Sequence, residues 1–264
     1  MTARGESPGS ELEVVVTGSG PRVGYLHGFV CEPTGQPFLS ALAGHGLEVV
    51  APSLPGFGGT PSADDIRGIH DWVWHLSDII DRSGLAGRPV VASSVGAMLA
   101  LELASLRPEA FSSLVLIGPL GLWDDDDPVT DPFSTTLGNQ RALLTSDPSV
   151  TASFFDDPSD LAPERTVERT VRRYTARTAA ASLVWPLPEF GLAQRIGRVR
   201  VPVTLVWGAD DRIVSPRYAG RFARHLDVRD SIVVDGAGHL AEWDSPAVVA
   251  ELAARALRKG SVDD

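Results

Sequence analysis

The stretch Val90-Val91-Ala92-Ser93-Ser94-Val95-Gly96-Ala97 decides the fold of this chain. It joins an apolar run typical of a buried strand to a segment with the pattern of a helix. A serine on so tight a strand-to-helix turn needs small residues two positions before and after it, because larger side chains would collide there. Ala92 and Gly96 meet this requirement around Ser94, whereas Ser93 has a β-branched valine at both of those positions. Ser94 is therefore the predicted nucleophile.

Short apolar runs alternate with helical patterns along most of the chain. This alternation predicts an α/β fold, with a mostly parallel sheet of about eight strands flanked by helices. The expected strands cover Leu12–Thr17, Arg22–Leu26, Leu47–Ala51, Pro89–Ser93, Ser113–Ile117, Val201–Trp207 and Ser231–Val234. The expected helices around the sheet cover Pro37–Gly44, Ile69–Ser83, Val95–Leu106, Ser215–His225 and Pro246–Leu257. The first two strands could instead form an antiparallel hairpin, because only Gly18-Ser19-Gly20-Pro21 separates them.

The alternation stops between Gly118 and about Arg198, where helical segments follow one another with Asp, Pro and Gly breaks. Helices inserted between two strands of a sheet suggest a cap that lies over the site. We therefore expect an α/β core formed by residues 1–118 and 199–264, and a helical cap (lid) formed by residues 119–198. The segments with a helical pattern there are Asn139–Leu144, Val150–Phe155 and Ala162–Leu183.

The longest of these cap helices carries both an apolar stripe and several arginines. The stripe places on one face, at helical spacing, Val167, Val171, Tyr174 and Ala181, with Thr178 as its polar member. The arginines that fall largely elsewhere on the helix are Arg165, Arg169, Arg172 and Arg177. We expect these arginines to form a solvated face, with the alternative that one of them binds a substrate carboxylate.

Composition narrows the class of protein and of partner. At 264 residues with 43% hydrophobic content, the chain can bury a full core. Its 23 basic and 34 acidic residues give a net charge of −11, which argues against nucleic acid as a partner. Cys31 is the only cysteine, so an intramolecular disulfide and a thiolate zinc cluster are excluded. The acidic run from Asp124 to Asp127 fits a solvated loop better than a metal site.

No apolar leader and no apolar run long enough to span a bilayer is visible in the sequence. We therefore expect a soluble, cytoplasmic protein without a membrane partner, either a monomer or a homodimer.

A serine hydroxyl becomes a good nucleophile only when a base takes its proton and a third group orients that base. His239 is the predicted base, because Gly236-Ala237-Gly238-His239 follows a strand and can deliver an imidazole to the edge of the sheet. Asp211 is the predicted acid, on the loop after the preceding strand. Asp210 and Asp124 are alternatives for that acid.

Acyl transfer also needs N–H donors aimed at the oxygen that becomes negatively charged. The amide of Val95 lies just beyond the nucleophile at the start of a helix, and the amide of Phe29, after Gly28, would complete the oxyanion hole. In the same segment His27 fits a role in loop structure better than a role in chemistry. The expected pocket walls are Phe29, Val95, Val30, Cys31, Trp123, Phe133, Trp185, Leu187 and Phe190. This chemistry requires no metal ion and no organic cofactor.

From about Leu12 to Leu257 the chain resembles the α/β-hydrolase superfamily, in its capped, esterase-like and C–C-hydrolase-like branch. The motifs that carry the resemblance are Leu26-His27-Gly28-Phe29, Leu54-Pro55-Gly56-Phe57-Gly58, the Ser94 turn, Gly208-Ala209-Asp210-Asp211 and Gly236-Ala237-Gly238-His239. The resemblance implies that Ser94, Asp211 and His239 act as nucleophile, acid and base. It also implies that Phe29 and Val95 supply the oxyanion amides.

Three positions depart from the pattern of that family. Ser93 stands before the nucleophile, where the family usually has His. Ser53-Leu54 precedes the Pro-Gly turn, where Asp is frequent. Phe29-Val30-Cys31-Glu32-Pro33 replaces the Gly-Gly-Gly-Pro-Gly type of loop seen in hydrolases of ring-cleavage products, which argues against a vinylogous diketone substrate.

The resemblance implies a serine hydrolase that cleaves a carboxylic ester or lactone through an acyl-enzyme, acting on a small and moderately apolar carbonyl substrate. C–C bond hydrolysis of a β-ketone and thioester or amide cleavage are alternatives. A non-hydrolytic lyase, an oxygenase or a ligand-binding receptor is a further alternative, because fold does not determine function. A serine nucleophile argues against a dehalogenase or an epoxide hydrolase, which would carry Asp.

Overall fold

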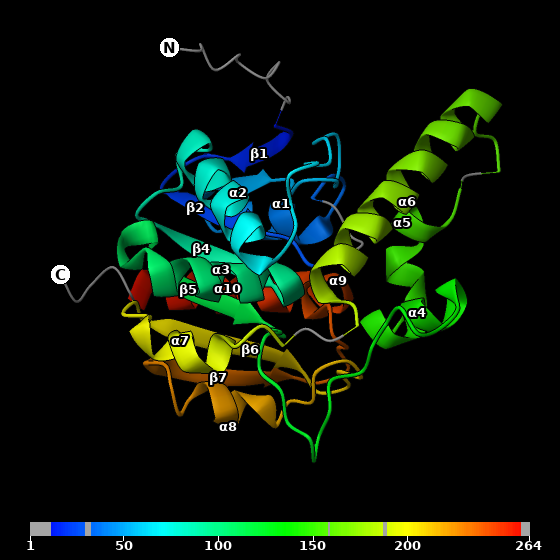
Figure 1. Ribbon diagram of the computed structural model, residues 1–264. Helices are drawn as coiled ribbons and strands as arrows, with labels where there is room; N and C mark the ends of the chain where they lie inside the picture. The colour runs from blue at the N-terminus through cyan, green and yellow to red at the C-terminus, as the bar shows by residue number, and fades with distance from the viewer. Residues whose placement is uncertain (1–11, 30–32, 158, 187–188, 260–264) are drawn as a thin grey trace, which may run out of the picture.

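The structure is a computed structural model that describes residues 12–29, 33–157, 159–186 and 189–259 (Figure 1). In this part of the chain seven strands form one sheet, in the order β1-β3-β2-β4-β5-β6-β7. The strands are β1 (Val14–Gly18), β2 (Arg22–Leu26), β3 (Glu48–Pro52), β4 (Arg88–Ser93), β5 (Phe111–Ile117), β6 (Val203–Gly208) and β7 (Val228–Val234). The predicted α/β fold is therefore confirmed, with seven described strands where about eight were expected.

All neighbouring strands run parallel except β1 and β3, which are antiparallel. The hairpin alternative for the first two strands is wrong, because β3 lies between them and pairs with both. Burial explains this order. In β3 the residues from Val49 to Pro52 are buried, as an interior strand requires, whereas β1 is only partly buried and alternates with exposed positions.

Helices cover both faces of the sheet. Their bounds are α1 (Pro37–Ala43), α2 (Ile69–Arg82), α3 (Ser94–Leu106), α8 (Tyr218–Phe222), α9 (Ala241–Asp244) and α10 (Pro246–Lys259). The apolar residues of α1 and α10 pack on one face, and those of α2, α3 and α8 pack on the other. The short helix α9 contributes Ala241 to the first cluster and Trp243 to the second.

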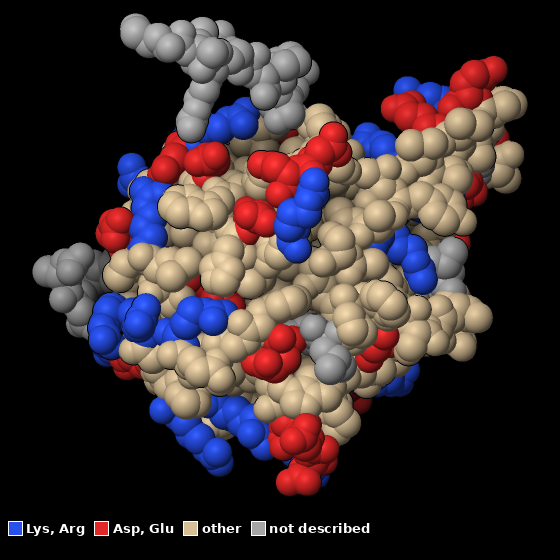
Figure 2. Space-filling model, viewed as in Figure 1, with Lys and Arg blue, Asp and Glu red and all other residues tan. Residues whose placement is uncertain are grey.

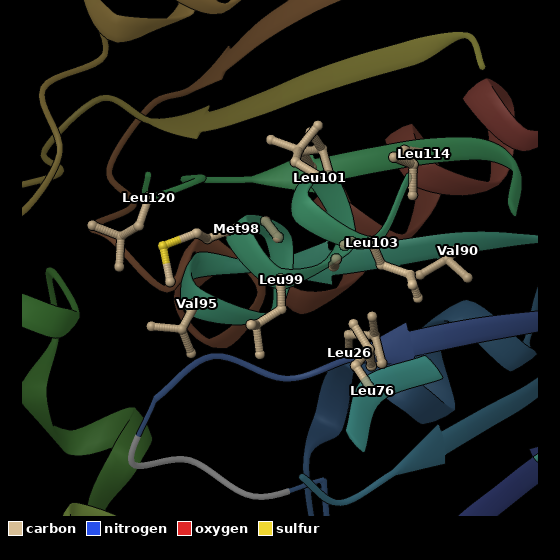
Figure 3. Packing of buried hydrophobic residues seen from close by; sticks show 14 of the residues in the cluster. Leu26, Leu76, Val90, Val95, Met98, Leu99, Leu101, Leu103, Leu114 and Leu120 are labelled. Atoms are coloured by element: carbon tan, nitrogen blue, oxygen red, sulfur yellow. The ribbon is translucent and has the colours of Figure 1, made fainter. Parts of the chain in front are cut away.

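The helix α3 is buried from Ser94 to Ser105, as a helix that is apolar on all sides requires. Figure 3 shows its leucines and Met98 among side chains of other elements, including Leu26 of β2 and Leu76 of α2.

Between β5 and β6 the regular elements of the described residues are all helices. They are α4 (Leu137–Leu144), η2 (Pro148–Thr151), α5 (Ala152–Phe155), α6 (Pro163–Val184), α7 (Leu192–Arg195) and η3 (Ile196–Arg198). In Figure 1, α6 projects away from the sheet, whereas α7 lies close to it. The division into a core and a cap at residues 119–198 stays a prediction. Because α7 and η3 pack against α3, we favour a cap that ends before Leu192.

The apolar stripe predicted on α6 faces solvent rather than the protein. The exposed fractions of Val167, Val171 and Tyr174 are 63%, 58% and 62%. The helix instead buries the opposite, alanine-rich side near its C-terminal end, through Ala176, Ala179, Ala180, Leu183 and Val184. Small side chains let another segment approach the helix axis closely, and hydropathy alone does not show this preference.

The arginines of α6 mostly form ion pairs at the surface. Arg169 and Arg173 both contact the carboxylate of Asp157, and Arg165 pairs with Glu168. Arg177 differs from these, because its guanidinium donates to the amide oxygen of the buried residue Gln140, at 2.6 Å. The expected solvated face therefore describes the outer part of the helix but not Arg177.

On the face shown in Figure 2, acidic and basic side chains are interspersed. Of the acidic run that begins at Asp124, the carboxylate of Asp124 pairs with Arg221, and the carbonyl of Asp127 accepts the hydroxyl of Tyr218. The described ranges bring together no group of three or more His, Cys, Asp or Glu side chains that could hold a metal ion. No helix within these ranges is long and apolar enough to cross a bilayer.

We expect Arg195→Ala to lower the free energy of unfolding by about 3 kcal/mol, because it leaves a buried carboxylate without its partner. Arg195 of α7 makes two contacts with Glu102 of α3, at 2.6 and 2.9 Å, and Glu102 is only 2% exposed. Urea unfolding at pH 7 measures this change. The exposed neighbour Arg198 is the matched control, and Arg198→Ala should cost less than about 0.5 kcal/mol. Equal losses for the two variants would contradict the assignment.

Candidate active site

The turn between β4 and α3 places Ser94 at its apex. Ser94 has a φ of 55°, and within the described ranges it is the one residue other than glycine with a positive φ. Such a conformation is uncommon for an L-residue and is found at functional sites that the surrounding structure holds in place. A Cβ on Gly96 would lie 2.5 Å from the carbonyl oxygen of His27 and 2.7 Å from that of Leu26. The small residue two positions after the serine is therefore needed for the close approach of β2.

Ser94 and His239 meet at the carboxyl edge of the sheet. The Oγ atom of Ser94 lies 2.7 Å from Nε2 of His239, and both residues are fully buried. His239 comes from the loop that follows β7. The hydroxyl of the neighbouring residue Ser93 is also buried and makes no hydrogen bond of good geometry.

The carboxylate of Asp211 lies on the other side of the imidazole. Its Oδ2 atom is 2.9 Å from Nδ1 of His239, and its Oδ1 atom accepts the amides of Ile213 and Val214, each at 2.9 Å. The side chains of Asp211 and His239 are fully buried. With Nδ1–H donating to Asp211, the lone pair of Nε2 is available to the Ser94 hydroxyl.

The structure also places the two alternative acids. Asp210 points the other way and accepts the hydroxyl of Ser146 at 3.2 Å, while Asp124 pairs with Arg221. Gly118, directly after β5, leaves room for the carboxylate of Asp211. It has a φ of 49°, and a Cβ there would lie 3.2 Å from Oδ2 of Asp211.

The loop that carries His239 is bonded to the inserted segment. The carboxylate of Asp244 accepts the amides of Gly238 at 2.7 Å, Ser146 at 2.9 Å and Asp147 at 3.1 Å. The amide of Leu240 donates to the carbonyl of Leu144, at 2.8 Å. Sequence reasoning did not identify Asp244, and the signal available for it was an acid five residues after the histidine, at the end of a short helix.

His27 shapes the loop after β2. Its Nδ1 atom lies 2.7 Å from the carbonyl oxygen of Gly28, and its Nε2 atom accepts the amide of Leu54 at 3.0 Å. Burial lowers the pKa of His27 to about 4, so the ring stays neutral at physiological pH. These contacts agree with the structural role expected from the sequence.

The aromatic ring of Phe29 lies between the histidine and the inserted segment. Its centroid is 5.8 Å from that of the His239 ring and 5.9 Å from that of the Phe133 ring. Phe29 and Val95 are both fully buried, and Val95 is the second residue of α3. Of the predicted pocket residues, Phe133 is thus the one that the structure places in ring contact with Phe29.

The other predicted pocket residues are distributed differently. Trp123 and Phe190 are half-buried against the main core. Trp185 is 60% exposed, so the expectation that its indole lines the pocket is not supported. Its neighbour Val184 is buried instead. Val30, Cys31 and Leu187 lie outside the described residues.

A small, mainly apolar cavity adjoins Phe29. The residues that line it with Phe29 are Leu120, Val129, Thr130, Asp131, Pro132, Val184, Pro186 and Ile213. Sequence reasoning missed this set. The signal for Leu120 and Ile213 was their place just after β5 and just after Asp211, at the same edge of the sheet.

Residues 25–252 match the Alpha/beta hydrolase family. A 2-hydroxy-6-oxo-6-phenylhexa-2,4-dienoate hydrolase of Burkholderia cepacia is 24% identical to this chain, over 89% of the chain and 83% of the hydrolase. A strigolactone esterase of Arabidopsis thaliana is 26% identical, over 93% of the chain and 96% of the esterase. The crystal structure of a serine hydrolase involved in carbazole degradation has a TM-score of 0.72 and is 25% identical, over 94% of this chain and 95% of that one. These relatives thus include hydrolases named for different small-molecule substrates.

We expect the protein to lose stability as pH falls from about 7 to about 4, because of His27. Its pKa of about 4 in the folded state is below the ordinary value of 6.5, so in this range the unfolded chain binds the proton more readily. The contribution is constant above about pH 7 and decreases on acidification by up to about 3 kcal/mol. Urea unfolding at several pH values should show a smaller decrease for His27→Gln, which has no group to titrate. An equal decrease in both proteins would contradict the assignment.

Proposed function

The chain belongs to the alpha/beta hydrolase family, and we propose that it is a serine hydrolase that cleaves a carboxylic ester or lactone through an acyl-enzyme. The observation that carries this proposal is the unbroken series of contacts from the Ser94 hydroxyl through His239 to Asp211. A buried serine, imidazole and carboxylate in this order are the parts that acyl transfer needs.

In the proposed reaction, Nε2 of His239 takes the proton of Ser94 as Oγ attacks the substrate carbonyl. Asp211 keeps the imidazole in the required tautomer and stabilises the imidazolium that forms. The amides of Phe29 and Val95 would donate to the resulting oxyanion, and the position of Val95 at the start of α3 adds the favourable field of the helix N-terminus.

The reaction then releases first the alcohol and, after attack by water, the acid. His239 donates its proton to the leaving alcohol, then takes a proton from water, which attacks the acyl-enzyme. Collapse of the second tetrahedral intermediate returns the proton to Ser94 and frees the carboxylic acid. Each proton that leaves Ser94 or water therefore passes through one imidazole.

Burial of the site indicates the kind of substrate. Ser94 and His239 have no exposed surface, and Phe29 and Phe133 lie beside the imidazole. A small, moderately apolar carbonyl compound fits these surroundings. Since the nucleophile is covered, entry of the substrate requires the covering residues to move.

Hydrolysis of a C–C bond beside a ketone is the second candidate. The relative from Burkholderia cepacia is named for a dienoate, which is a carboxylate anion. Arg177 is a cation beside Phe133, with its guanidinium carbon 5.6 Å from the centroid of the Phe133 ring. That arrangement favours a subsite for a substrate carboxylate. The relative from Arabidopsis thaliana is named as an esterase and supports the first candidate.

Turnover of a p-nitrophenyl butyrate ester, compared with turnover of a 2-hydroxy-6-oxo-dienoate, separates the two candidates. The ester hydrolase should release p-nitrophenol with saturable kinetics and leave the dienoate unchanged. Efficient cleavage of the dienoate that Arg177→Gln weakens mainly through KM would favour the second candidate. Labelling by a fluorophosphonate probe should occur in both cases, because both use an activated serine.

We expect Ser94→Ala to lower ester turnover by at least about 10⁴-fold and to abolish probe labelling, because the nucleophile is removed. The thermal unfolding midpoint should change little, since only one hydroxyl is lost. Ser93→Ala is the matched control next to it, and it should lose no more than about 10-fold in turnover and keep the probe labelling. Loss of activity in Ser93→Ala with an active Ser94→Ala would show that the wrong serine was assigned.

We also expect Asp211→Asn to lower kcat by about 10⁴-fold, because the amide leaves the imidazole in the wrong tautomer. Asp210→Asn should cost far less, since the carboxylate of Asp210 contacts Ser146 and not His239. Steady-state kinetics on the same ester measure both variants. A larger loss for Asp210→Asn would contradict the assignment of the acid.

A further inference from the structure

Behind the nucleophile lies a group of four buried polar side chains that the proposed chemistry does not use. We call Tyr25, Gln36, Ser93 and Glu242 the buried quartet. Their exposed fractions are all 3% or less. Tyr25 belongs to β2, Ser93 ends β4, Gln36 precedes α1, and Glu242 lies in α9, three residues after His239. The ring of Tyr25 packs in the core that α1 and α10 cover, on the opposite face of the sheet from α3.

Hydrogen bonds connect three of the four residues. The amide nitrogen of Gln36 donates to the hydroxyl of Tyr25 at 2.8 Å, and that hydroxyl donates to Oε1 of Glu242 at 3.1 Å. The hydroxyl of Ser93 lies beside the same carboxyl group and is one of the groups that lower its pKa. The quartet therefore spans β2, β4 and α9 directly below the catalytic edge of the sheet.

Several polar atoms of the quartet are left without a hydrogen bond of good geometry. These atoms are Oε2 of Glu242, Oγ of Ser93 and Oε1 of Gln36. Buried polar atoms normally have partners, so orphan atoms this close together call for an explanation. A proton on Oε2 supplies one, because it turns that oxygen into a donor with the Ser93 hydroxyl as a neighbouring acceptor.

The electrostatics of the site agree with a protonated Glu242. Burial raises the pKa of its carboxyl, while the Ser93 and Tyr25 hydroxyls and the charge of protonated His239 lower it by less. Among the ion pairs of the described ranges, no arginine or lysine pairs with Glu242. A neutral carboxyl avoids the large cost of a buried and unpaired charge.

We propose that Glu242 is a positioning residue, which joins the nucleophile segment to the base segment from behind through Ser93 and Tyr25. Ser93 is bonded to Ser94, whose backbone is held in an unfavourable conformation, and Glu242 follows His239 by less than one helical turn. One buried side chain thus links the neighbours of both reacting groups. The inference rests on the roles proposed above for Ser94 and His239.

The rate of the proposed proton transfer depends on the distance between the Ser94 hydroxyl and the His239 imidazole. A general base must lie within hydrogen-bond reach of the proton that it takes, and a misplacement of about 1 Å can cost about 100-fold in rate. The quartet supplies polar side chains between the end of β4 and the helix after His239. Loss of Glu242 should therefore lower kcat and leave KM nearly unchanged, because the quartet lies away from the substrate.

Two substitutions of Glu242 test this proposal on p-nitrophenyl butyrate. Glu242→Gln retains one acceptor for Tyr25 and one donor for Ser93, and should keep kcat within about 3-fold of the wild type. Glu242→Leu removes both, and should lower kcat by about 10- to 100-fold with KM changed less than about 2-fold. The exposed glutamate Glu251 of α10 is the control, and Glu251→Leu should leave kcat unchanged.

A second readout does not depend on turnover. In crystals of Glu242→Leu, the distance between Ser94 Oγ and His239 Nε2 should exceed hydrogen-bond reach, whereas Glu242→Gln should preserve the 2.7 Å contact. If Glu242→Leu does not fold, Tyr25→Phe replaces it, with an expected loss in kcat of about 3- to 10-fold.

Two results would overturn the proposal. Equal and large losses in Glu242→Gln and Glu242→Leu would show that an ionised carboxylate is required. Full activity and an unchanged Ser94–His239 distance in Glu242→Leu would show that the quartet only fills space. Failure of the wild type to hydrolyse the ester, with the expected distances in the variants, would count against the proposed function alone.

Discussion

The backbone of Ser94 is the constraint on which the rest of the structure depends. It holds a left-handed conformation between a central parallel strand and a helix that is buried on all sides. The turn cannot relax, because Gly96 lies against the carbonyl groups at the end of β2. The remaining parts of the site come from the loops after β2, β6 and β7, which end at the same edge of the sheet. Parallel strands bring these loops together, although they are far apart in the chain.

Much of this arrangement was readable from local patterns. Ser94 could be chosen over Ser93 because the turn tolerates only small neighbours, and this steric rule needs no knowledge of the partner elements. His239 and Asp211 each follow a strand on a loop, so their meeting followed from the parallel sheet. The order of β1, β2 and β3 was not readable in the same way. It depends on which strand is buried on both faces, and this is decided by pairing between segments that lie apart in the sequence.

The other sequence-based expectations that differ from the structure, or were missed, concern which side chains are buried. The exposed stripe on α6 carries the bulky side chains of Val167, Val171 and Tyr174, whereas the helix buries a side made mainly of alanines, because packing rewards close approach as well as hydropathy. Trp185 also shows that hydropathy alone does not decide burial. Its side chain is exposed, while its neighbours Val184 and Pro186 line a cavity. Glu242 was overlooked because a glutamate in a helix is usually solvated. Only the fold shows that it lies beneath the turn of Ser94.

The bonds of Asp244 define which pieces of this protein could be exchanged with those of a relative. One carboxylate holds the amides of Ser146 and Asp147 in the inserted segment and that of Gly238 in the histidine loop. A chimaera that replaced the insertion alone would place a foreign backbone against this carboxylate, in place of the amides of Ser146 and Asp147. The natural unit for recombination therefore includes the turn after α4 together with residues 238–244. The turn after α4 and the loop of His239 would then be inherited as one block.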